Sequence, residues 1–273
     1  MAQSSPILLV GCGKMGGAML AGWLGRGMNA ADIVAVEPSR ELADVLREQH
    51  GIIVAPDADA VPESFKPAIV IFAVKPQMMD AVAPDYAGFI RDGALVLSIA
   101  AGKTIAYFQG FFGNDCAVVR TMPNTPAAVG RGITALFANA QTSEAQKQAA
   151  EGLLQAVGET VWLDDEGQMD AVTAVSGGGP AYVFLLIEAM TKSGIASGLP
   201  VEVSAKLAHA TVTGAGELAR QAEEAPEQLR KNVTSPAGTT LEALNVLMAD
   251  DGIQPLFDRA IAAATRRSRE LAG

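Results

Sequence analysis

The chain has 273 residues, enough for one large domain or two smaller domains that each bury a core. Apolar residues make up 49% of the chain and charged residues 18%, which excludes a disordered protein. The net charge of −10 argues against a nucleic-acid-binding protein, because phosphate contacts need a basic surface, although small anions respond to local dipoles and single cations.

Cysteine usage and the chain start bear on the compartment. Cys12 and Cys116 are the only cysteines and lie far apart, so we expect a reducing, cytoplasmic environment, no disulfide and no metal site. Met1–Pro6 has no basic segment, so the apolar run that follows predicts a strand and not a signal peptide. Uninterrupted apolar runs such as Ala181–Ile187 are shorter than the roughly 20 residues of a membrane span. We therefore expect no membrane segment.

Residues 1–164 alternate short apolar runs with helical patterns. Near-continuous apolar runs are typical of parallel strands that are covered on both faces. The predicted strands are Ile7–Val10, Ile33–Val36, Ile69–Phe72, Leu95–Ser98, Cys116–Arg120, Thr134–Phe137 and Thr160–Leu163. Helical patterns occupy Ser39–His50 and Pro76–Ile90. This order predicts an α/β domain over residues 1–164, a Rossmann-type doubly wound and mostly parallel sheet.

Residues 165–273 predict a second, all-helical domain. The strand signal stops after Asp165, and turn signals separate long Ala- and Leu-rich segments. The predicted helices are Pro180–Ser193, Glu202–Glu224, Leu241–Met248 and Gln254–Leu271. Segment Pro180–Ser193 is apolar almost all round. It is expected either to bury one side against another subunit or to form the centre of its own domain.

A glycine-rich loop follows the first predicted strand directly. Gly11-Cys12-Gly13-Lys14-Met15-Gly16 matches G-x-G-x-x-G between a strand and a helix. Gly11 permits the tight turn, Gly13 lets a pyrophosphate approach the backbone, and Gly16 lets helix and strand pack closely. The loop predicts a dinucleotide site.

The end of the second predicted strand should meet the adenosine ribose. Glu37 lies 21 residues after Gly16, the position of an acid that binds a ribose 2′-hydroxyl, which favours NAD. Ser39 and Arg40 would suit a 2′-phosphate, which favours NADP. Arg40 could instead pair with Glu37 or Glu41 at the surface. The pattern leaves the choice of cofactor open.

Several further motifs resemble those of the pyrroline-5-carboxylate reductase family. They occur in order along nearly the whole chain: Ala73-Val-Lys-Pro76, Ser98-Ile-Ala-Ala-Gly102, Met122-Pro-Asn-Thr-Pro126, Ser176-Gly-Gly-Gly-Pro-Ala-Tyr182 and Asn232-Val-Thr-Ser-Pro-Ala-Gly-Thr-Thr240. Two positions depart from the family pattern. Glu37 stands where Ser or Thr is common, and Gly178 replaces a frequent serine. The first departure puts the usual NADPH preference in doubt here.

The resemblance implies the last step of proline biosynthesis, the reduction of the cyclic imine 1-pyrroline-5-carboxylate to L-proline. The implied cofactor is NADPH or NADH, with a slight preference for NADPH and dual use. The helical domain would form a homodimer, with larger rings such as a decamer in some members. The cofactor residues carried over by position are Cys12, Lys14, Met15, Val74, Lys75, Pro76, Ala101, Asn124 and Pro126. The implied substrate residues are Glu166, Asn232, Thr239 and Thr240.

Residues 235–240 begin a predicted helix and offer an anion site of their own. Backbone N–H groups of Gly238, Thr239 and Thr240 are expected to bind a carboxylate at the positive end of the helix dipole. Ser235 would bind the same carboxylate or serve only as a turn residue. The Thr240 hydroxyl, which both donates and accepts, is the candidate catalytic group at the ring nitrogen.

Charged side chains and rival functions complete the interpretation. Arg120 and Lys231 are interpreted as solvated charges more readily than as site residues. Another NAD(P)-dependent reductase or a 3-hydroxyacid dehydrogenase of the same two-part design is an alternative. The latter uses a lysine four residues after a glycine cluster, where this chain has Val183. A non-catalytic nucleotide-binding scaffold is a further alternative, which the intact stretch at 232–240 disfavours.

Overall fold

The computed structural model of the chain describes residues 5–272. The prediction that no signal peptide opens the chain falls mostly on residues 1–4, which lie outside the described residues. The chain forms two units: residues up to Gly177 together with those from Thr265 make the first, and Gly178–Ala264 make the second. The boundary expected between residues 164 and 165 stays a prediction.

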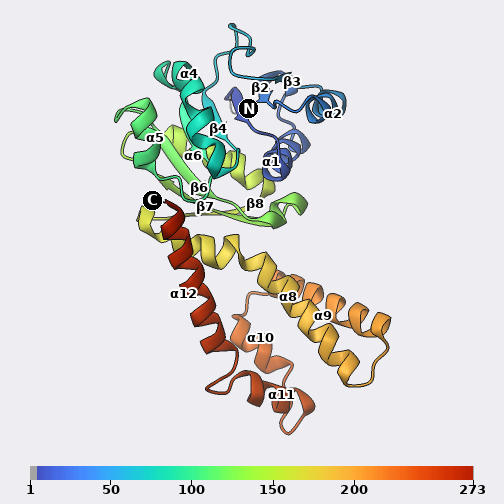
Figure 1. Ribbon diagram of the computed structural model, residues 1–273. Helices are drawn as coiled ribbons and strands as arrows, with labels where there is room; N and C mark the ends of the chain where they lie inside the picture. The colour runs from blue at the N-terminus through green and yellow to red at the C-terminus, as the bar shows by residue number, and fades with distance from the viewer. Residues whose placement is uncertain (1–4, 273) are drawn as a thin grey trace. The chain divides into compact units, whose positions relative to one another are not determined.

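The first unit contains an eight-stranded sheet in the order β3-β2-β1-β4-β5-β6-β7-β8 (Figure 1). Every pairing is parallel except that of β6 with β7, so the predicted, mostly parallel doubly wound sheet is confirmed. The strands are β1 Ile7–Val10, β2 Ile33–Val36, β3 Ile53–Ala55, β4 Ile69–Phe72, β5 Leu95–Ser98, β6 Val118–Met122, β7 Gly132–Ala138 and β8 Gly158–Trp162.

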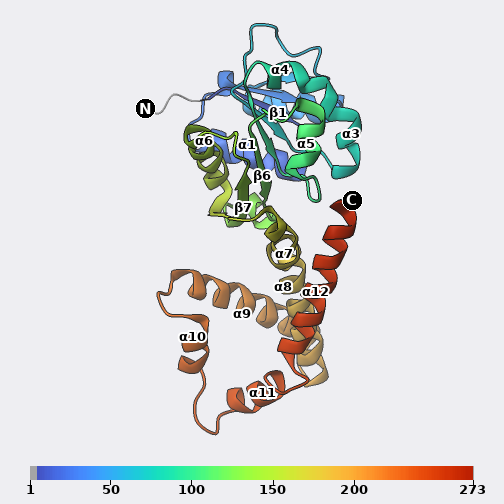
Figure 2. The same ribbon diagram turned by 90° about the vertical axis from the view of Figure 1, so that its left-hand side faces the viewer.

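Helices cover both faces of this sheet (Figure 2). One layer holds α1 (Lys14–Gly25), α2 (Arg40–His50) and α6 (Glu144–Leu154), and the other holds α3 (Met79–Val82), α4 (Ala87–Arg91) and α5 (Ile105–Phe112). Alternate residues of β1 serve the two layers: Leu9 packs in the cluster with Trp23, and Leu8 in the cluster with Phe72 and Phe108. Both cores are therefore built from the period-two alternation of buried strands.

The predicted helix Pro76–Ile90 is wrong as a single element. The structure divides it into a 3₁₀ turn Pro76–Met78, α3, a second 3₁₀ turn Ala83–Tyr86, and α4. Pro84 lacks the N–H that a continuous helix would use, and its ring clashes with the preceding turn. Other 3₁₀ segments in this unit are Ala30–Asp32, Thr125–Val129, Gln155–Val157 and Glu166–Gln168.

The second unit is entirely helical over its described residues, as predicted. Its helices are α8 Gly179–Ala196, α9 Val201–Gln221, α10 Pro226–Asn232 and α11 Thr239–Leu247, and α12 Ile253–Ala272 begins in it and ends in the first unit. α7 (Met169–Val172) and a π turn at Thr173–Gly177 precede α8. α8 packs against α9, where the Ser204 hydroxyl donates to the Thr191 carbonyl at 2.8 Å.

The helical unit leaves much of its apolar surface open. In the single chain α8 has no buried residue, and Phe184 and Leu185 are each 61% exposed. The placement of this helix at the centre of its own domain is therefore wrong for one chain. The helical stretch Glu166–Ala196 is long and apolar enough to cross a membrane by length and composition, with a mean hydropathy of 1.3. The same measures describe a helix that another subunit covers.

Candidate active site

The predicted cofactor residues gather at one edge of the sheet. Strands β1, β2, β4, β5 and β6 run parallel, so their carboxyl ends share that edge, and β1 and β4 are the neighbours where the strand order reverses. Nucleotides bind open α/β sheets at such a switch point. The residues that follow these strands are Gly11–Gly16, Glu37–Arg40, Val74–Pro76, Ala101, and Asn124 with Pro126.

The glycine loop has the geometry of a phosphate cradle. Gly11 has φ +91°, and a side chain there would lie 2.8 Å from Val74 Cγ1. A side chain at Gly16 would collide with the main-chain oxygen of Gly11. At Gly13, by contrast, no atom lies within 4 Å of the position a side chain would take. The first and last glycines are thus needed for packing, and the middle one borders open space.

The helix that follows this loop begins without a side-chain cap. Gly13 is the N-cap of α1 and supplies no hydrogen bond from a side chain. Lys14 is exposed and Met15 half-buried. Uncapped first-turn N–H groups and the helix dipole together favour an anion. Backbone of the loop and of Lys14 is therefore open to a pyrophosphate.

The Cys12 side chain is buried in the core and does not face the site. The residue is 3% exposed, and its side chain packs in the core cluster with Leu9. Burial, and then the nearby charge of Glu37, raise the pKa of the Cys12 thiol to about 12. The thiol is therefore neutral near pH 7 and acts as a small apolar group.

Glu37 joins the glycine loop to the turn that follows β2. Its Oε2 accepts a hydrogen bond from the Cys12 N–H at 3.2 Å, and its Oε1 accepts one from the Ser39 N–H at 3.0 Å. Ser39 is the N-cap of α2, and its Oγ accepts from the Leu42 N–H at 3.4 Å. Arg40 extends into solvent with 95% side-chain exposure, and its Nε lies 4.0 Å from Asp44 Oδ2. The alternative ion pair between Arg40 and Glu37 does not occur among these contacts.

The loops after β4 and β5 flank the same edge. Val74 contacts the glycine loop, Lys75 is the exposed N-cap of a 3₁₀ turn, and Pro76 is the first residue of that turn. Ala101 is in the loop after β5 and has two fixed neighbours. The Ala100 N–H donates to Ser98 Oγ at 3.2 Å, and Gly102 adopts φ +76°. Lys75 is thus an exposed residue of the loop after β4, and its role as a cation beside the cofactor stays a prediction.

A three-residue cluster that the sequence did not reveal joins these two loops. Tyr107 Oη donates to Asp80 Oδ1 at 2.5 Å, Lys103 Nζ lies 3.4 Å from the same oxygen, and this ammonium stands 4.1 Å from the centre of the Tyr107 ring. The hydrogen bond from Tyr107, followed by that from Lys103, lowers the pKa of the Asp80 carboxyl. The cluster attaches α3 to the loop that carries Ala101. Separations of 23 and 27 residues leave no local pattern that could have found it.

Asn124 and Pro126 lie where β6 ends and a 3₁₀ turn begins. Asn124 Oδ1 accepts from the Ile133 N–H at 2.9 Å, and its Nδ2 donates to the Ser176 carbonyl at 3.3 Å. Pro126 closes the same turn by accepting from the Arg131 N–H at 3.0 Å. The Asn124 amide thus has a structural role in shaping the turn.

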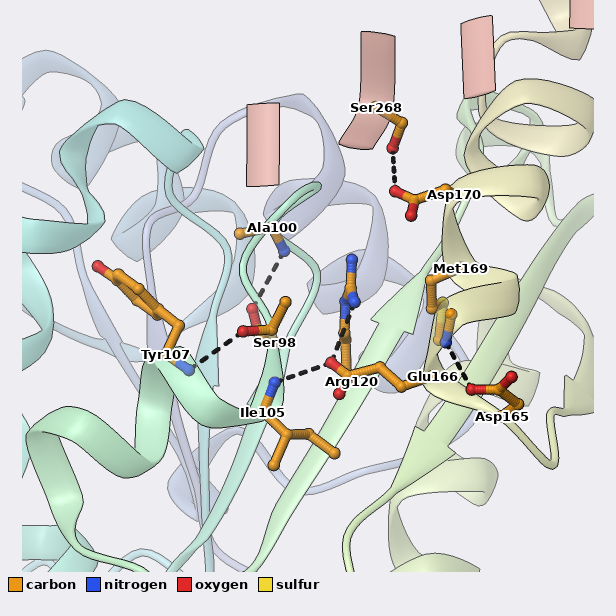
Figure 3. A network of polar contacts seen from close by, with 12 residues as sticks. Ser98, Ala100, Ile105, Tyr107, Arg120, Asp165, Glu166, Met169, Asp170 and Ser268 are labelled. Carbon is orange, nitrogen blue, oxygen red and sulfur yellow. Dashed lines mark hydrogen bonds and ion pairs between the residues drawn. The ribbon is translucent and has the colours of Figure 1, made fainter. Parts of the chain in front are cut away.

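Glu166 is held by an ion pair within the first unit (Figure 3). Its Oε1 accepts from the Ile105 N–H at 2.8 Å and from Arg120 Nη1 at 3.0 Å. Arg120 is only 6% exposed, so the interpretation of it as a solvated charge is wrong. A long-range partner, invisible in the local sequence, neutralises it. Lys231 is exposed and pairs with Glu227 at 2.6 Å, as expected for a surface lysine.

The remaining predicted residues lie in the second unit at the start of α11. Gly238 is its N-cap and supplies no side-chain hydrogen bond, while Thr239 and Thr240 are its exposed first residues. The Gly238 N–H donates to the Ser235 carbonyl at 3.1 Å, and its use for an external carboxylate stays a prediction. The N–H groups of Thr239 and Thr240 have no intrahelical acceptor because they belong to the first turn.

Two other features bear on this helix start. Asn232 ends α10, and its Oδ1 accepts from Gln228 Nε2 at 2.8 Å. Ala237 adopts φ +55°, which makes it the one non-glycine residue with positive φ among the described residues. This strained residue sets the turn before Gly238. Among residues 5–272 as a whole, no group of three or more His, Cys, Asp or Glu side chains is placed to hold a metal ion.

The comparisons with known proteins agree with these two units. A family model described as pyrroline-5-carboxylate reductase dimerisation matches residues 166–271, and one described as NADP oxidoreductase coenzyme F420-dependent matches residues 6–102. The chain is 43% identical over 272 residues to a pyrroline-5-carboxylate reductase of Pseudomonas aeruginosa, covering 99% of this chain and 98% of that protein.

Solved structures give the same result. A pyrroline-5-carboxylate reductase from Coxiella burnetii superposes with a TM-score of 0.93 at 34% identity, covering 99% of this chain and 100% of that chain. A Plasmodium falciparum pyrroline carboxylate reductase with NADP bound superposes with a TM-score of 0.82 at 26% identity, covering 99% of each. The resemblance predicted from the motifs is confirmed, and the chain belongs to the pyrroline-5-carboxylate reductase family.

Proposed function

We propose that this protein reduces 1-pyrroline-5-carboxylate to L-proline with NAD(P)H. The observation that carries the proposal is the full-length relationship to pyrroline-5-carboxylate reductases together with an open glycine cradle at the switch point of the sheet. The reaction adds a hydride to the carbon of the C=N bond and a proton to its nitrogen, while NAD(P)H becomes NAD(P)⁺.

The residues of the first unit fit a dinucleotide. The loop of Gly11, Gly13 and Gly16 combines two sterically required glycines with one that borders open space. The pyrophosphate would be held by the loop backbone and the start of α1, with Lys75 as the neighbouring cation. When bound, the cofactor supplies a hydride, and the protein supplies orientation and electrostatics.

The start of α11 would hold the substrate carboxylate. Its dipole and the N–H groups of Thr239 and Thr240 favour an anion, and a side chain at Gly238 would collide with Ser235, so glycine is needed to form this turn. Ser235 and Asn232 flank the turn and complete this proposed substrate group. Thr240 would place its hydroxyl at the ring nitrogen, where it can donate or accept.

An iminium accepts hydride without metal or covalent catalysis, so the demands on the protein are modest. A held carboxylate and an oriented ring lower the activation barrier mainly by reducing the entropy that must be lost in the transition state. A strong general base is not needed. This explains chemically why exposed threonines at a helix start suffice as the proposed site.

We further propose that the protein is a cytoplasmic homodimer, or a larger ring built from such dimers. The open apolar surface of α8 and the match of residues 166–271 to a dimerisation family support association. A second subunit would cover side chains such as Phe184 and Leu185. Sedimentation at several protein concentrations tests the proposal, which a monomer at micromolar concentration would exclude.

The activity is tested by following NAD(P)H absorbance at 340 nm with the imine in equilibrium with glutamate semialdehyde. We expect oxidation that depends on both substrate and enzyme and that yields proline. No oxidation of either cofactor at millimolar imine would refute the reductase proposal. It would favour a scaffold if the cofactor still binds.

Replacing the proposed catalytic hydroxyl tests the substrate end separately. Thr240→Ala should lower kcat/KM about ten- to a hundredfold, the effect of one hydrogen bond to a charged group, with cofactor affinity nearly unchanged. Thr213→Ala is the matched control, because its exposed hydroxyl in α9 bonds only to main-chain carbonyls of the same helix. Equal losses of cofactor affinity and kcat/KM in Thr240→Ala would show that the hydroxyl maintains the fold instead.

A further inference from the structure

Glu37 directly follows β2, the position at which Rossmann folds bind the adenosine ribose of a dinucleotide. We infer that Glu37 makes this site select the free ribose 2′-hydroxyl of NADH over the 2′-phosphate of NADPH. The inference rests on the proposed function, because it concerns the cofactor of that reaction.

The Glu37 carboxylate accepts hydrogen bonds from the protein backbone, in the way a bound anion would. Each oxygen accepts one backbone N–H, Oε2 from Cys12 in the glycine loop and Oε1 from Ser39 at the start of α2. These bonds fix the half-buried side chain between the loops after β1 and β2. Each carboxylate oxygen has a second lone-pair direction, so it can still accept from a ribose hydroxyl. The site is therefore preorganised for a hydroxyl donor.

The same arrangement opposes a 2′-phosphate. Such a phosphate needs N–H donors and cations, and the N–H groups of Cys12 and Ser39 already serve Glu37. A phosphate placed there would also lie beside a like charge. The neighbouring cation, Arg40, is 95% exposed and directed toward Asp44, and Glu41 adds another acid to the first turn of α2.

These contacts change the expectation drawn from the family. The motifs favoured NADPH with dual use, and the Plasmodium falciparum relative was solved with NADP bound. Ser39 and Arg40 are the residues that would suit a 2′-phosphate. In the structure the Ser39 N–H donates to Glu37, and the Arg40 side chain extends into solvent with its Nε 4.0 Å from Asp44 Oδ2. Glu37 is hydrogen-bonded to the loops after both β1 and β2.

Equilibrium binding of NAD⁺ and NADP⁺ to the full-length wild-type protein, by calorimetry at one ionic strength without substrate, tests the inference. We expect NAD⁺ to bind at least about tenfold more tightly, the effect of one hydrogen bond to a charged group. Equal or tighter binding of NADP⁺ would overturn it. Binding of neither nucleotide would refute both proposals, whereas tight NAD⁺ binding without imine reduction would refute only the proposed function.

Two variants that each remove one negative charge provide the matched comparison. Glu37→Gln should move the ratio of NADP⁺ to NAD⁺ affinity toward NADP⁺ by at least about tenfold, and Glu41→Gln by less than about twofold. Equal shifts in both variants would show that overall charge, and not the position of Glu37, sets the ratio. If Glu37→Gln does not fold, the wild-type measurement still decides the question.

Discussion

Replacing Glu166 with alanine removes one carboxylate oxygen that serves two donors. The change leaves the Arg120 guanidinium, 6% exposed, without its partner and the Ile105 N–H without an acceptor. Three segments lose a common attachment: β6, the start of α5 and the 3₁₀ turn at Glu166–Gln168. We expect a loss of stability larger than that of an ordinary surface substitution.

The size of this loss follows from the burial of the pair. Removing one partner of a buried ion pair costs about 3–5 kcal/mol. The Glu166 side chain keeps 27% exposure, so water partly replaces it and the lower end of that range applies. We therefore expect about 3 kcal/mol, which corresponds to a thermal midpoint roughly 6–12 °C lower for a domain of this size.

The assay is thermal and urea unfolding of wild type and variants at one protein concentration. Glu48→Ala is the matched control, because Glu48 is exposed on α2 and should change stability by less than about 0.5 kcal/mol. In an Arg120→Met background, the further change Glu166→Ala should cost only about 1 kcal/mol, since the buried charge is then absent. A cost below 1 kcal/mol in the wild-type background would refute the reasoning.

A further variant, Glu166→Gln, addresses the substrate role predicted for Glu166, which stays a prediction. Its contacts favour an anchor for the start of α5. An anchor predicts that Glu166→Gln, which keeps the acceptor oxygen, retains most of the stability and most of the kcat/KM. A contact with the iminium predicts a selective fall in kcat/KM with stability kept, because only the charge is lost.

Two further predictions concern the glycine loop and the cluster beside it. Gly13→Ala should keep the wild-type thermal midpoint and lower NAD(P)H affinity at least about tenfold. Gly16→Ala should lower both the thermal midpoint and the affinity, because of these two positions only at Gly16 does the added side chain collide with the loop. Thermal unfolding measures the first quantity and calorimetry the second. Tyr107→Phe should raise the pKa of the Asp80 carboxyl, measured by NMR titration. Because the folded-state pKa is lowered, the stability Asp80 contributes is present above its unfolded pKa and is lost as pH falls through the folded pKa, so wild type and variant should converge in acid. An unchanged Asp80 titration would contradict the second prediction.

Local pattern was sufficient for most of the sheet because buried parallel strands leave a direct signal. Ile7–Val10, Ile33–Val36, Ile69–Phe72 and Leu95–Ser98 are strands with the predicted limits. The strand predicted at Cys116–Arg120 instead begins at Val118. There Asn139, from beyond the next strand, bonds both the Val118 N–H and the Cys116 carbonyl and so ends the ladder. β3 has only three residues, too few for a periodic signal.

Candidate site residues could be predicted where they directly follow a strand. Their contacts could not be predicted where the partner is distant in sequence. The glycine loop and the residue after β2 were found from spacing alone. The two hydrogen bonds of Glu37 were not, because they require the loops after β1 and β2 to meet. Arg120 was misread for the same reason, since its neutralising carboxylate lies 46 residues away.

In the helical unit, contacts within a single chain do not account for the many apolar residues of the sequence. α8, α10 and α11 contain no buried residue in the described chain, although most residues of α8 and α11 are apolar. Exposed Glu188 and Lys192 pair within α8, so a bilayer would have to accept two charges on this helix, at a cost of a few kcal/mol each near its centre. A second copy of the chain would instead cover apolar residues such as Phe184 and Leu185. The stability of this unit should therefore rise with protein concentration, which is the behaviour expected when folding and association are linked.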